Sequence, residues 1–192
     1  KEIVYGKLAG VFYNAKEMVL LPLALCAALW ATGHLEGENL AFLAAGFAAV
    51  NCFSAMLGIH LGMMYANSRT AVGVSLGTVL FLVLGIAVCM RMMLAFQDSF
   101  GYQLQAFLAF MFGGGVGLVC AVGYRYESKA LFLACMFAPF ATYYVMTSFL
   151  KSSFGAAAMV TVIAYGFATA AMLVPAIDEF DIATGRTRAQ DA

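Results

Sequence analysis

Long apolar runs dominate the pattern of hydrophobic and polar positions along this chain of 192 residues. Runs of about 18 to 25 residues with few or no charges alternate with short clusters that hold most of the charged side chains. A helix rises about 1.5 Å per residue, so about 20 apolar residues cross a hydrocarbon core of roughly 30 Å. Because 64% of the residues are apolar and only 10% are charged, the pattern predicts an all-α, polytopic membrane helical bundle.

Six membrane-spanning helices are predicted from these runs. A membrane β-barrel would need segments of about ten residues with alternating polarity, so strands are not expected. The predicted spans are Glu17–Thr32, Leu40–Ala66, Thr70–Phe96, Leu104–Gly123, Ala130–Leu150 and Gly155–Ala176. The predicted connections, each too short to fold as a soluble domain, are His34–Asn39, Asn67–Arg69, Gln97–Gln103, Tyr124–Lys129 and Lys151–Phe154.

The distribution of Lys and Arg predicts the orientation of the bundle, because cytoplasmic loops carry an excess of these residues. With six spans both termini lie on one side of the membrane. The other side would hold only Arg91 and Lys151, so both termini are predicted to be cytoplasmic. The predicted cytoplasmic set is Lys1, Lys7, Lys16, Arg69, Arg125, Lys129, Arg186 and Arg188.

The segment before the first span is amphipathic. Val4, Leu8 and Val11 share one helical face, whereas Lys1 and Lys7 lie towards the other. This pattern is typical of a helix lying in the membrane interface. We therefore expect an interfacial or coupling helix at 1–16, a six-helix transmembrane domain at 17–176 and a cytoplasmic tail at 177–192. The chain opens on Lys1 without a signal peptide, and we interpret it as the C-terminal part of a longer protein.

Three of the predicted spans carry glycines four residues apart. Such pairs form a flat strip that another helix backbone can approach closely, so they are predicted to be helix-packing positions. The third pair belongs to an unusual run, Gly-Gly-Gly-Val-Gly, which is alternatively a flexible point where a helix bends. The pairs are Gly58 and Gly62, Gly73 and Gly77, and Gly113 and Gly117.

Polar residues inside the spans are few. Asn51 and Ser54 are three residues apart and share a face of the second span, and His60 points in a broadly similar direction. These three are candidates for lining a pathway, although such groups more often hydrogen-bond to a neighbouring helix. No Asp or Glu lies deep in a span, which argues against a proton or sodium relay based on carboxylates.

Sequence motifs for chemistry are missing from this chain. It has no GxxxxGK[ST] loop, no HExxH and no GxSxG. Its five cysteines form no CxxC pair, so neither a disulfide framework nor a zinc site is predicted. The formal net charge of zero gives no nucleic-acid footprint. We therefore expect a protein that is not an enzyme and that holds no catalytic residue, metal or cofactor of its own.

Three segments resemble parts of ABC-2 type transporter permeases. The first is Glu2-Ile-Val-Tyr-Gly-Lys-Leu-Ala-Gly10, which is similar to an E-I-x-x-G-K-x-x-G segment of that family. The second, residues 57–71, resembles a family turn between helices, although Ala66 and Asn67 replace its usual Ser-rich stretch. The third is Phe180-Asp-Ile-Ala-Thr-Gly-Arg186, similar to an F-D-x-x-x-G-R ending. The three occur in order along the whole chain.

The resemblance implies a permease of an ATP-driven exporter in the bacterial inner membrane. It implies an ABC ATPase partner that binds ATP and Mg²⁺, and a homo- or heterodimer with a second permease unit. The candidate surface for coupling to the ATPase comprises Glu2, Tyr5, Lys7 and Arg69. The alternative is a non-transporting scaffold or anchor subunit, which also fits the scarcity of ionisable groups in the spans.

Overall fold

The computed structural model describes residues 2–123 and 128–183, and side chains within 2–5, 7, 8, 11 and 178–183 lie outside this description. The described residues form helices and short turns, and no strand occurs among them. Six helical segments among the described residues are long and apolar enough to cross a membrane, which confirms the all-α bundle. The single-helix spans are α1 (Glu2–Ala31), α2 (Gly37–Met64), α7 (Lys129–Leu150) and α8 (Phe154–Ala183).

The third and fourth spans are each interrupted by π-helical turns. The third consists of α3 (Ser68–Leu80), the π segment η1 (Phe81–Gly85) and α4 (Ile86–Ala95). The fourth consists of α5 (Phe100–Leu108), η2 (Ala109–Gly113), α6 (Gly114–Leu118) and η3 (Val119–Gly123). One helix was predicted for each span, with a flexible point at the glycine-rich run of the fourth as the alternative, and π turns were not predicted. π turns are rare, are stabilised by packing rather than by local preference, and often mark functional sites.

Local capping explains where several helices begin and end. The side chain of Asn67 accepts a hydrogen bond from the Arg69 amide at the start of α3, and that of Ser128 accepts one from the Leu131 amide at the start of α7. α1 ends in a Schellman motif, in which Gly33 has a φ of 75° and the His34 amide donates to the Leu29 carbonyl. These caps fix the short turns between spans.

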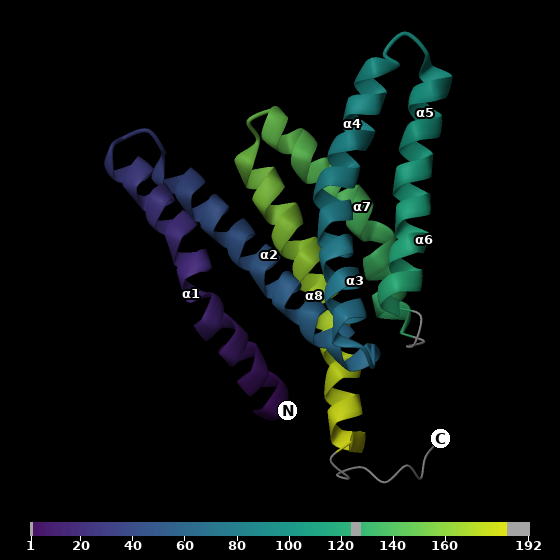
Figure 1. The fold of residues 1–192 in the computed structure, drawn as a ribbon. Helices are drawn as coiled ribbons and strands as arrows, with labels where there is room; N and C mark the ends of the chain where they lie inside the picture. Colours follow the sequence, from purple (N-terminus) through teal and green to yellow (C-terminus); the bar gives the residue numbers. More distant parts are fainter. Residues whose placement is uncertain (1, 124–127, 184–192) are drawn as a thin grey trace.

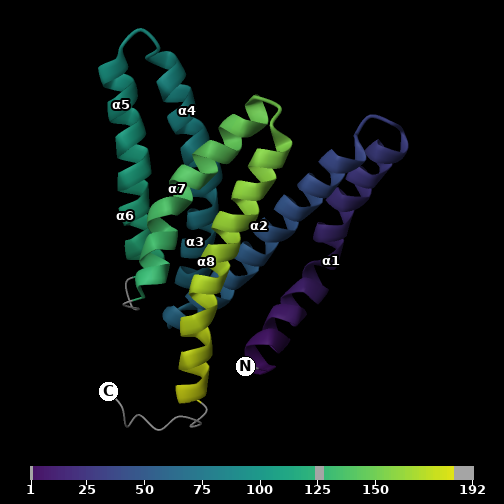
Figure 2. The ribbon, with the colours of Figure 1, turned by 180° about the vertical axis from the view of Figure 1, so that it is seen from behind.

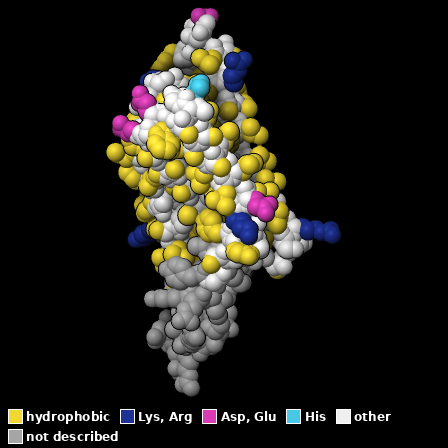
Figure 3. Space-filling model, turned by 90° about the vertical axis from the view of Figure 1, so that its left-hand side faces the viewer, with side chains coloured by type: hydrophobic (Ala, Val, Ile, Leu, Met, Phe, Trp, Pro, Cys, Tyr) yellow, Lys and Arg dark blue, Asp and Glu magenta, His cyan; other side chains and the backbone are white. Residues whose placement is uncertain are grey.

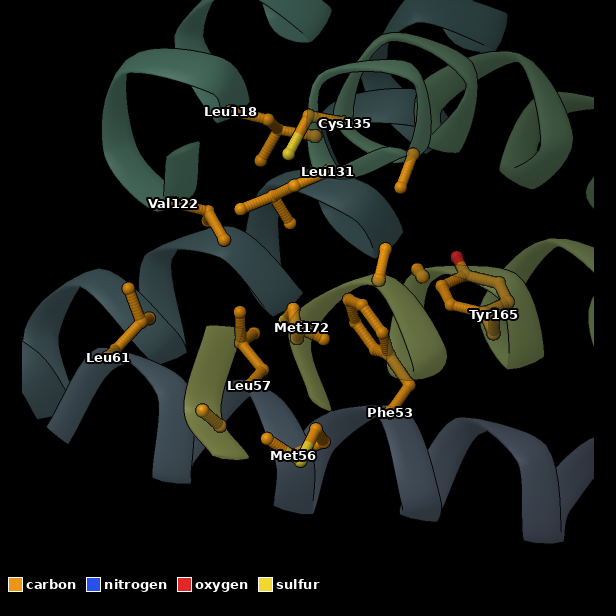
Figure 4. Close-up of a cluster of buried hydrophobic side chains, with 14 of the residues drawn as sticks. Phe53, Met56, Leu57, Leu61, Leu118, Val122, Leu131, Cys135, Tyr165 and Met172 are labelled. Atoms are coloured by element: carbon orange, nitrogen blue, oxygen red, sulfur yellow. The ribbon is translucent and has the colours of Figure 1, made fainter. Parts of the chain in front are cut away.

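α8 packs along both α2 and α7, and these three helices form the centre of the bundle (Figure 1). Their shared core is apolar: Met56, Leu57, Leu61, Leu131 and Met172 are each at most 1% exposed. Figure 4 shows these side chains meeting between the helices, together with Leu118 and Val122 of the fourth span. Since lipid is as apolar as this core, dispersion in close packing rather than removal from water holds the helices together.

The hairpin of the third and fourth spans projects from this centre, as the view from behind also shows (Figure 2). A second small core lies inside it, where Ile86, Cys89 and Met111 are fully buried. Aromatic side chains join this core to α7: the Phe107 ring lies 5.3 Å from the Tyr143 ring, centroid to centroid. The hairpin is thus anchored to the bundle mainly through α7.

α1 is continuous from Glu2 to Ala31, so no break separates residues 2–16 from the first span. The apolar window of its span, Phe12–Ala31, contains no buried residue, and α1 rests mainly against α2. At the other end of the chain α8 is helical to Ala183, although a tail was expected from residue 177. That 1–16 lies in the membrane interface stays a prediction.

The surface has the distribution expected of a membrane protein. Figure 3 shows a broad hydrophobic band between two levels at which charged side chains gather. Glu36 and Asp98 in turns and Glu38 in the first turn of α2 lie at one end. Arg69 and Lys129, in the first turns of α3 and α7, lie at the other, and all five are exposed. This distribution and the six apolar helices indicate an integral membrane protein.

Candidate functional site

The six glycines predicted to be helix-packing positions make no such contact within the chain. Each is exposed, and a Cβ added at any of them would meet no atom within 4 Å. The prediction was therefore wrong for packing inside the bundle: Gly58, Gly62, Gly73, Gly77, Gly113 and Gly117 face outwards. The spacing of the glycines does not show which way they face. On a helix that is apolar all round, the sequence pattern is the same whether the glycines face a neighbouring helix or the lipid.

Two glycines that pack closely against neighbouring helices lie between Gly113 and Gly117. A Cβ on Gly114 would overlap the Phe81 ring, lying 2.7 Å from its Cε1. A Cβ on buried Gly115 would lie 3.1 Å from the Met136 sulfur and 3.3 Å from the Met136 Cα. Gly114 therefore admits an aromatic ring from the third span, and Gly115 admits the backbone of α7. The glycine-rich run is explained by these two close approaches.

An open groove runs between the third and fourth spans. It has a volume of about 550 Å³. Gly77, Gly113 and Gly117, three of the exposed glycines, line it, so the groove exists partly because these positions carry no side chain. The other lining residues are Val74, Thr78, Phe81, Ala109, Phe110, Gly114, Leu118 and Ala121. All of these side chains except Thr78 are apolar.

π segments contribute residues to both walls of this groove. Phe81 opens η1, Ala109 and Gly113 bound η2, and Ala121 belongs to η3. A π turn uses i→i+5 hydrogen bonds and therefore rotates the part of the helix that follows it relative to the part that precedes it. The π turns and the outward glycines together shape this side of the hairpin. Thr78, Phe81 and the π segments were not predicted from the sequence, because no pattern in the apolar runs distinguishes them.

A second, smaller cavity of about 290 Å³ lies where α2, α7 and α8 meet near their Gly37, Leu150 and Phe154 ends. Its walls are apolar apart from Thr161. The Thr161 hydroxyl donates to the Ala157 carbonyl of its own helix at 2.7 Å, so it is already satisfied. This cavity offers a ligand no free polar group among the described residues.

The three predicted pathway residues are not brought together around a common cavity. The Asn51 side chain donates to the Phe47 carbonyl of its own helix at 2.8 Å. His60 is fully buried, and its Nε2 lies 3.0 Å from the Val122 carbonyl oxygen. Neither these two nor Ser54 lines the groove or the second cavity. Their role in a pathway stays a prediction.

His60 instead belongs to a contact between α2 and the end of the fourth span. In addition to the hydrogen bond between His60 and the Val122 carbonyl, the Tyr65 hydroxyl donates to the Ala121 carbonyl at 3.1 Å. The last carbonyls of a helix have no partner within the helix. The end of α2 therefore satisfies two carbonyls of η3, and it holds in place the part of the fourth span that borders the groove.

Of the four coupling candidates, the structure places one side chain. Arg69 is exposed in the first turn of α3, and it has no ion pair among the described residues. The side chains of Glu2, Tyr5 and Lys7 lie outside the described residues. The first turn of α1 and the α2–α3 turn lie at the same end of the bundle (Figure 1).

Groups that could hold a metal or carry out covalent chemistry do not cluster in the part of the chain that the structure describes. No three His, Cys, Asp or Glu side chains come together there. The cysteines are free and stand in different spans, Cys89 and Cys135 being buried. Comparison of the chain with protein-family models, curated proteins and solved structures finds no match. The candidate site is therefore the groove and the charged end of the bundle below it.

Proposed function

We propose that this chain is the membrane-spanning permease component of an ATP-driven exporter of the ABC-2 type in the bacterial inner membrane. The observation that carries the proposal is the placement of its motif-bearing segments. The start of α1, the α2–α3 turn and the end of α8 lie at one end of the bundle (Figure 1). Residues 184–186 of the third motif fall outside the described residues. A shared end is what a single docking surface for an ATPase requires.

In this proposal ATP and Mg²⁺ are bound by the partner ATPase, and this chain supplies the moving helices. Closure of the ATPase would push on α1 and on the exposed Arg69 at the α2–α3 turn. The third span continues from that turn, and the third and fourth spans both contain π segments, which are frequent at functional sites. A second permease unit, identical or different, would complete the pathway.

A scaffold or anchor role is the second candidate, and one observation favours it. No Asp, Glu, Lys or Arg is buried among the residues whose side chains are described. A transport path for an ion or a polar solute normally needs such groups at membrane depth. An apolar or amphipathic substrate would not need buried charged groups, so for a transporter the observation favours a substrate of this kind over an ion or a polar solute.

The test is purification of the chain in a mild detergent from its native membrane, followed by mass spectrometry of the bound subunits. The proposal predicts a stoichiometric subunit with a GxxxxGK[ST] loop and ATPase activity in the same complex. A complex with other subunits and without any nucleotide-binding chain would favour the scaffold. The same purification in the presence of an ATPase inhibitor controls for loss of a partner during turnover.

A further inference from the structure

We propose that the groove between the third and fourth spans binds one acyl chain of an anionic phospholipid. The lipid would come from the leaflet at the Ser68 and Gly123 ends of these spans. The proposal needs no transport activity, and it holds equally for a permease or a scaffold. It rests on the lining of the groove, its length, its volume and the charges at its end.

The lining matches a hydrocarbon chain. Every side chain on its walls is apolar except that of Thr78, which is 5% exposed. No charged residue among those that the structure describes lines the groove. A polar or charged ligand would leave its own groups unpaired in such a site, at a cost of several kcal/mol per group in hydrocarbon. A saturated chain has no such groups to satisfy.

The length of the groove matches one leaflet. On the third span its wall extends from Val74 to Phe81, and on the fourth from Ala109 to Ala121. At about 1.5 Å per residue the longer wall covers roughly 18 Å, close to half of a hydrocarbon core of about 30 Å. The walls end at Phe81 and Ala109, beside the midpoints of their spans. The groove therefore runs from the membrane centre to one interface.

The volume argues against a helix of a second copy as the occupant. A helix with its side chains is about 10 Å across, so 550 Å³ would hold little more than one turn of it. Sites of this volume fall in the range of roughly 300–1,000 Å³ that is typical for small ligands. An extended chain fills a narrow groove along its length, which a helix cannot do.

The charges at the open end select the headgroup. Arg69 lies in the first turn of α3, and Lys129 begins α7 at the same end of the bundle. Both are exposed, and neither has an ion pair among the described residues. Long cationic side chains at a membrane interface attract anionic lipids, each contributing about 1 kcal/mol. These two cationic side chains at the same membrane interface therefore favour an anionic headgroup such as that of phosphatidylglycerol.

The test uses phosphatidylglycerol with a photoreactive diazirine on its acyl chain, mixed into nanodiscs that contain the full chain. After illumination, adducts are mapped by peptide mass spectrometry. We expect adducts to concentrate on peptides covering 74–81 and 109–121. Equal labelling of every lipid-facing helix, α1 included, would overturn the proposal. A photoreactive phosphatidylcholine should give at least threefold fewer groove adducts, and equal labelling by both would overturn the choice of an anionic lipid.

Filling the groove provides the decisive variant. Gly113→Leu with Gly117→Leu places two side chains in the groove, where an added Cβ meets nothing within 4 Å. We expect groove adducts to fall about tenfold. The matched control is Gly58→Leu with Gly62→Leu, which alters an equally exposed glycine pair outside the groove and should leave the adducts unchanged. If the first variant does not fold, Gly77→Leu fills the groove from its other wall.

Two further measurements distinguish an acyl chain in the groove from a polar ligand and from a second copy of the protein. Among the described residues that line the groove, Thr78 has the only polar side chain, so labelling of a hydrocarbon chain should persist in Thr78→Val. Loss of labelling in Thr78→Val would mean that the ligand carries a polar group at this depth, which contradicts an acyl chain. Multi-angle light scattering of the filled variant should show the wild-type oligomer. A change from dimer to monomer with unaltered adducts would assign the groove to a second copy instead.

Discussion

The Thr142 hydroxyl oxygen lies 2.7 Å from the Tyr165 hydroxyl oxygen, which joins α7 to α8 in the core of the bundle. Thr142 also donates to the Ala138 carbonyl at 2.7 Å, so its single proton is used and the Tyr165 hydroxyl is the donor to Thr142. The Phe53 ring of α2 meets the Tyr165 ring edge-on at 4.9 Å. One tyrosine therefore links all three central helices.

Tyr165→Phe should destabilise the bundle modestly. The substitution removes the hydrogen bond to Thr142 but keeps the ring that contacts Phe53, and interhelical hydrogen bonds in membranes contribute about 0.6 kcal/mol on average. Unfolding in mixed micelles would measure the change in free energy. Tyr144→Phe is the matched control, because Tyr144 is 49% exposed on α7. A larger loss for Tyr144→Phe than for Tyr165→Phe would contradict this assignment.

Replacing neighbouring glycines of the glycine-rich run by alanine should change the free energy of unfolding in opposite directions. Gly114→Ala forces a Cβ into the Phe81 ring and should cost about 1–3 kcal/mol. Gly113→Ala meets open space and should gain up to about 1 kcal/mol of helix stability. Thermal unfolding in detergent compares the two variants. Phe81→Leu should partly rescue Gly114→Ala, and the absence of rescue would show that another contact is responsible.

The glycine-rich run also shows which part of the fold the sequence could not determine. Successive residues of a helix are turned by about 100°, so Gly113, Gly114 and Gly115 face different surroundings. The rotation of each helix decides which of them meets a neighbour. In a soluble helix the polar face would reveal that rotation, but lipid and core are equally apolar here. The packing glycines and the groove therefore emerge only from the structure.

The contact between α2 and η3 should matter for the fourth span. Tyr65→Phe removes a donor to the Ala121 carbonyl and should cost about 0.6 kcal/mol. It should also speed hydrogen exchange of amides in 119–123 without affecting those of α8. Tyr102→Phe, at an exposed position near the opposite end of this span, is the control. Unchanged exchange in both variants would mean that η3 does not depend on this bond.

The spans themselves could be predicted well from the sequence. The fifth was predicted at Ala130–Leu150 and is observed at Lys129–Leu150. Length and composition suffice here, because the backbone in lipid must satisfy its hydrogen bonds within each helix. The π turns could not be predicted, since they depend on how Phe81, Gly114 and their neighbours pack. The polar residues Asn51, Ser54 and His60 on α2 line neither cavity, and Asn51 bonds to its own helix, so their role in a pathway stays a prediction.

The orientation of the bundle can be tested with single cysteines in a Cys-free background. Glu36→Cys lies at one end of the bundle and Ala66→Cys at the other, and both positions are exposed. The excess of Lys and Arg at the Ala66 end predicts that an impermeant thiol reagent labels Glu36→Cys from outside intact cells. Ala66→Cys should react only after the cells are opened. The reverse pattern would invert the topology.

Coupling to an ATPase is tested by reversing one charge at each end of the bundle. Lys7→Glu changes the segment at the proposed cytoplasmic surface, whereas Lys151→Glu is the matched control at the opposite end, where Lys151 is exposed. Neither exchange should alter thermal stability by more than about 0.5 kcal/mol, because solvated surface positions tolerate substitution. A contact between proteins can depend on one well-placed charge by a few kcal/mol.

The measurement is ATP hydrolysis by the co-purified complex in proteoliposomes, with the wild-type chain and with each of the two variants. If the chain is the permease of an ATP-driven exporter, the wild-type complex hydrolyses ATP, Lys7→Glu reduces hydrolysis at least fivefold, and Lys151→Glu leaves it unchanged. A purified complex that contains no ATPase activity, or one in which both variants hydrolyse ATP like the wild type, would contradict the proposed function.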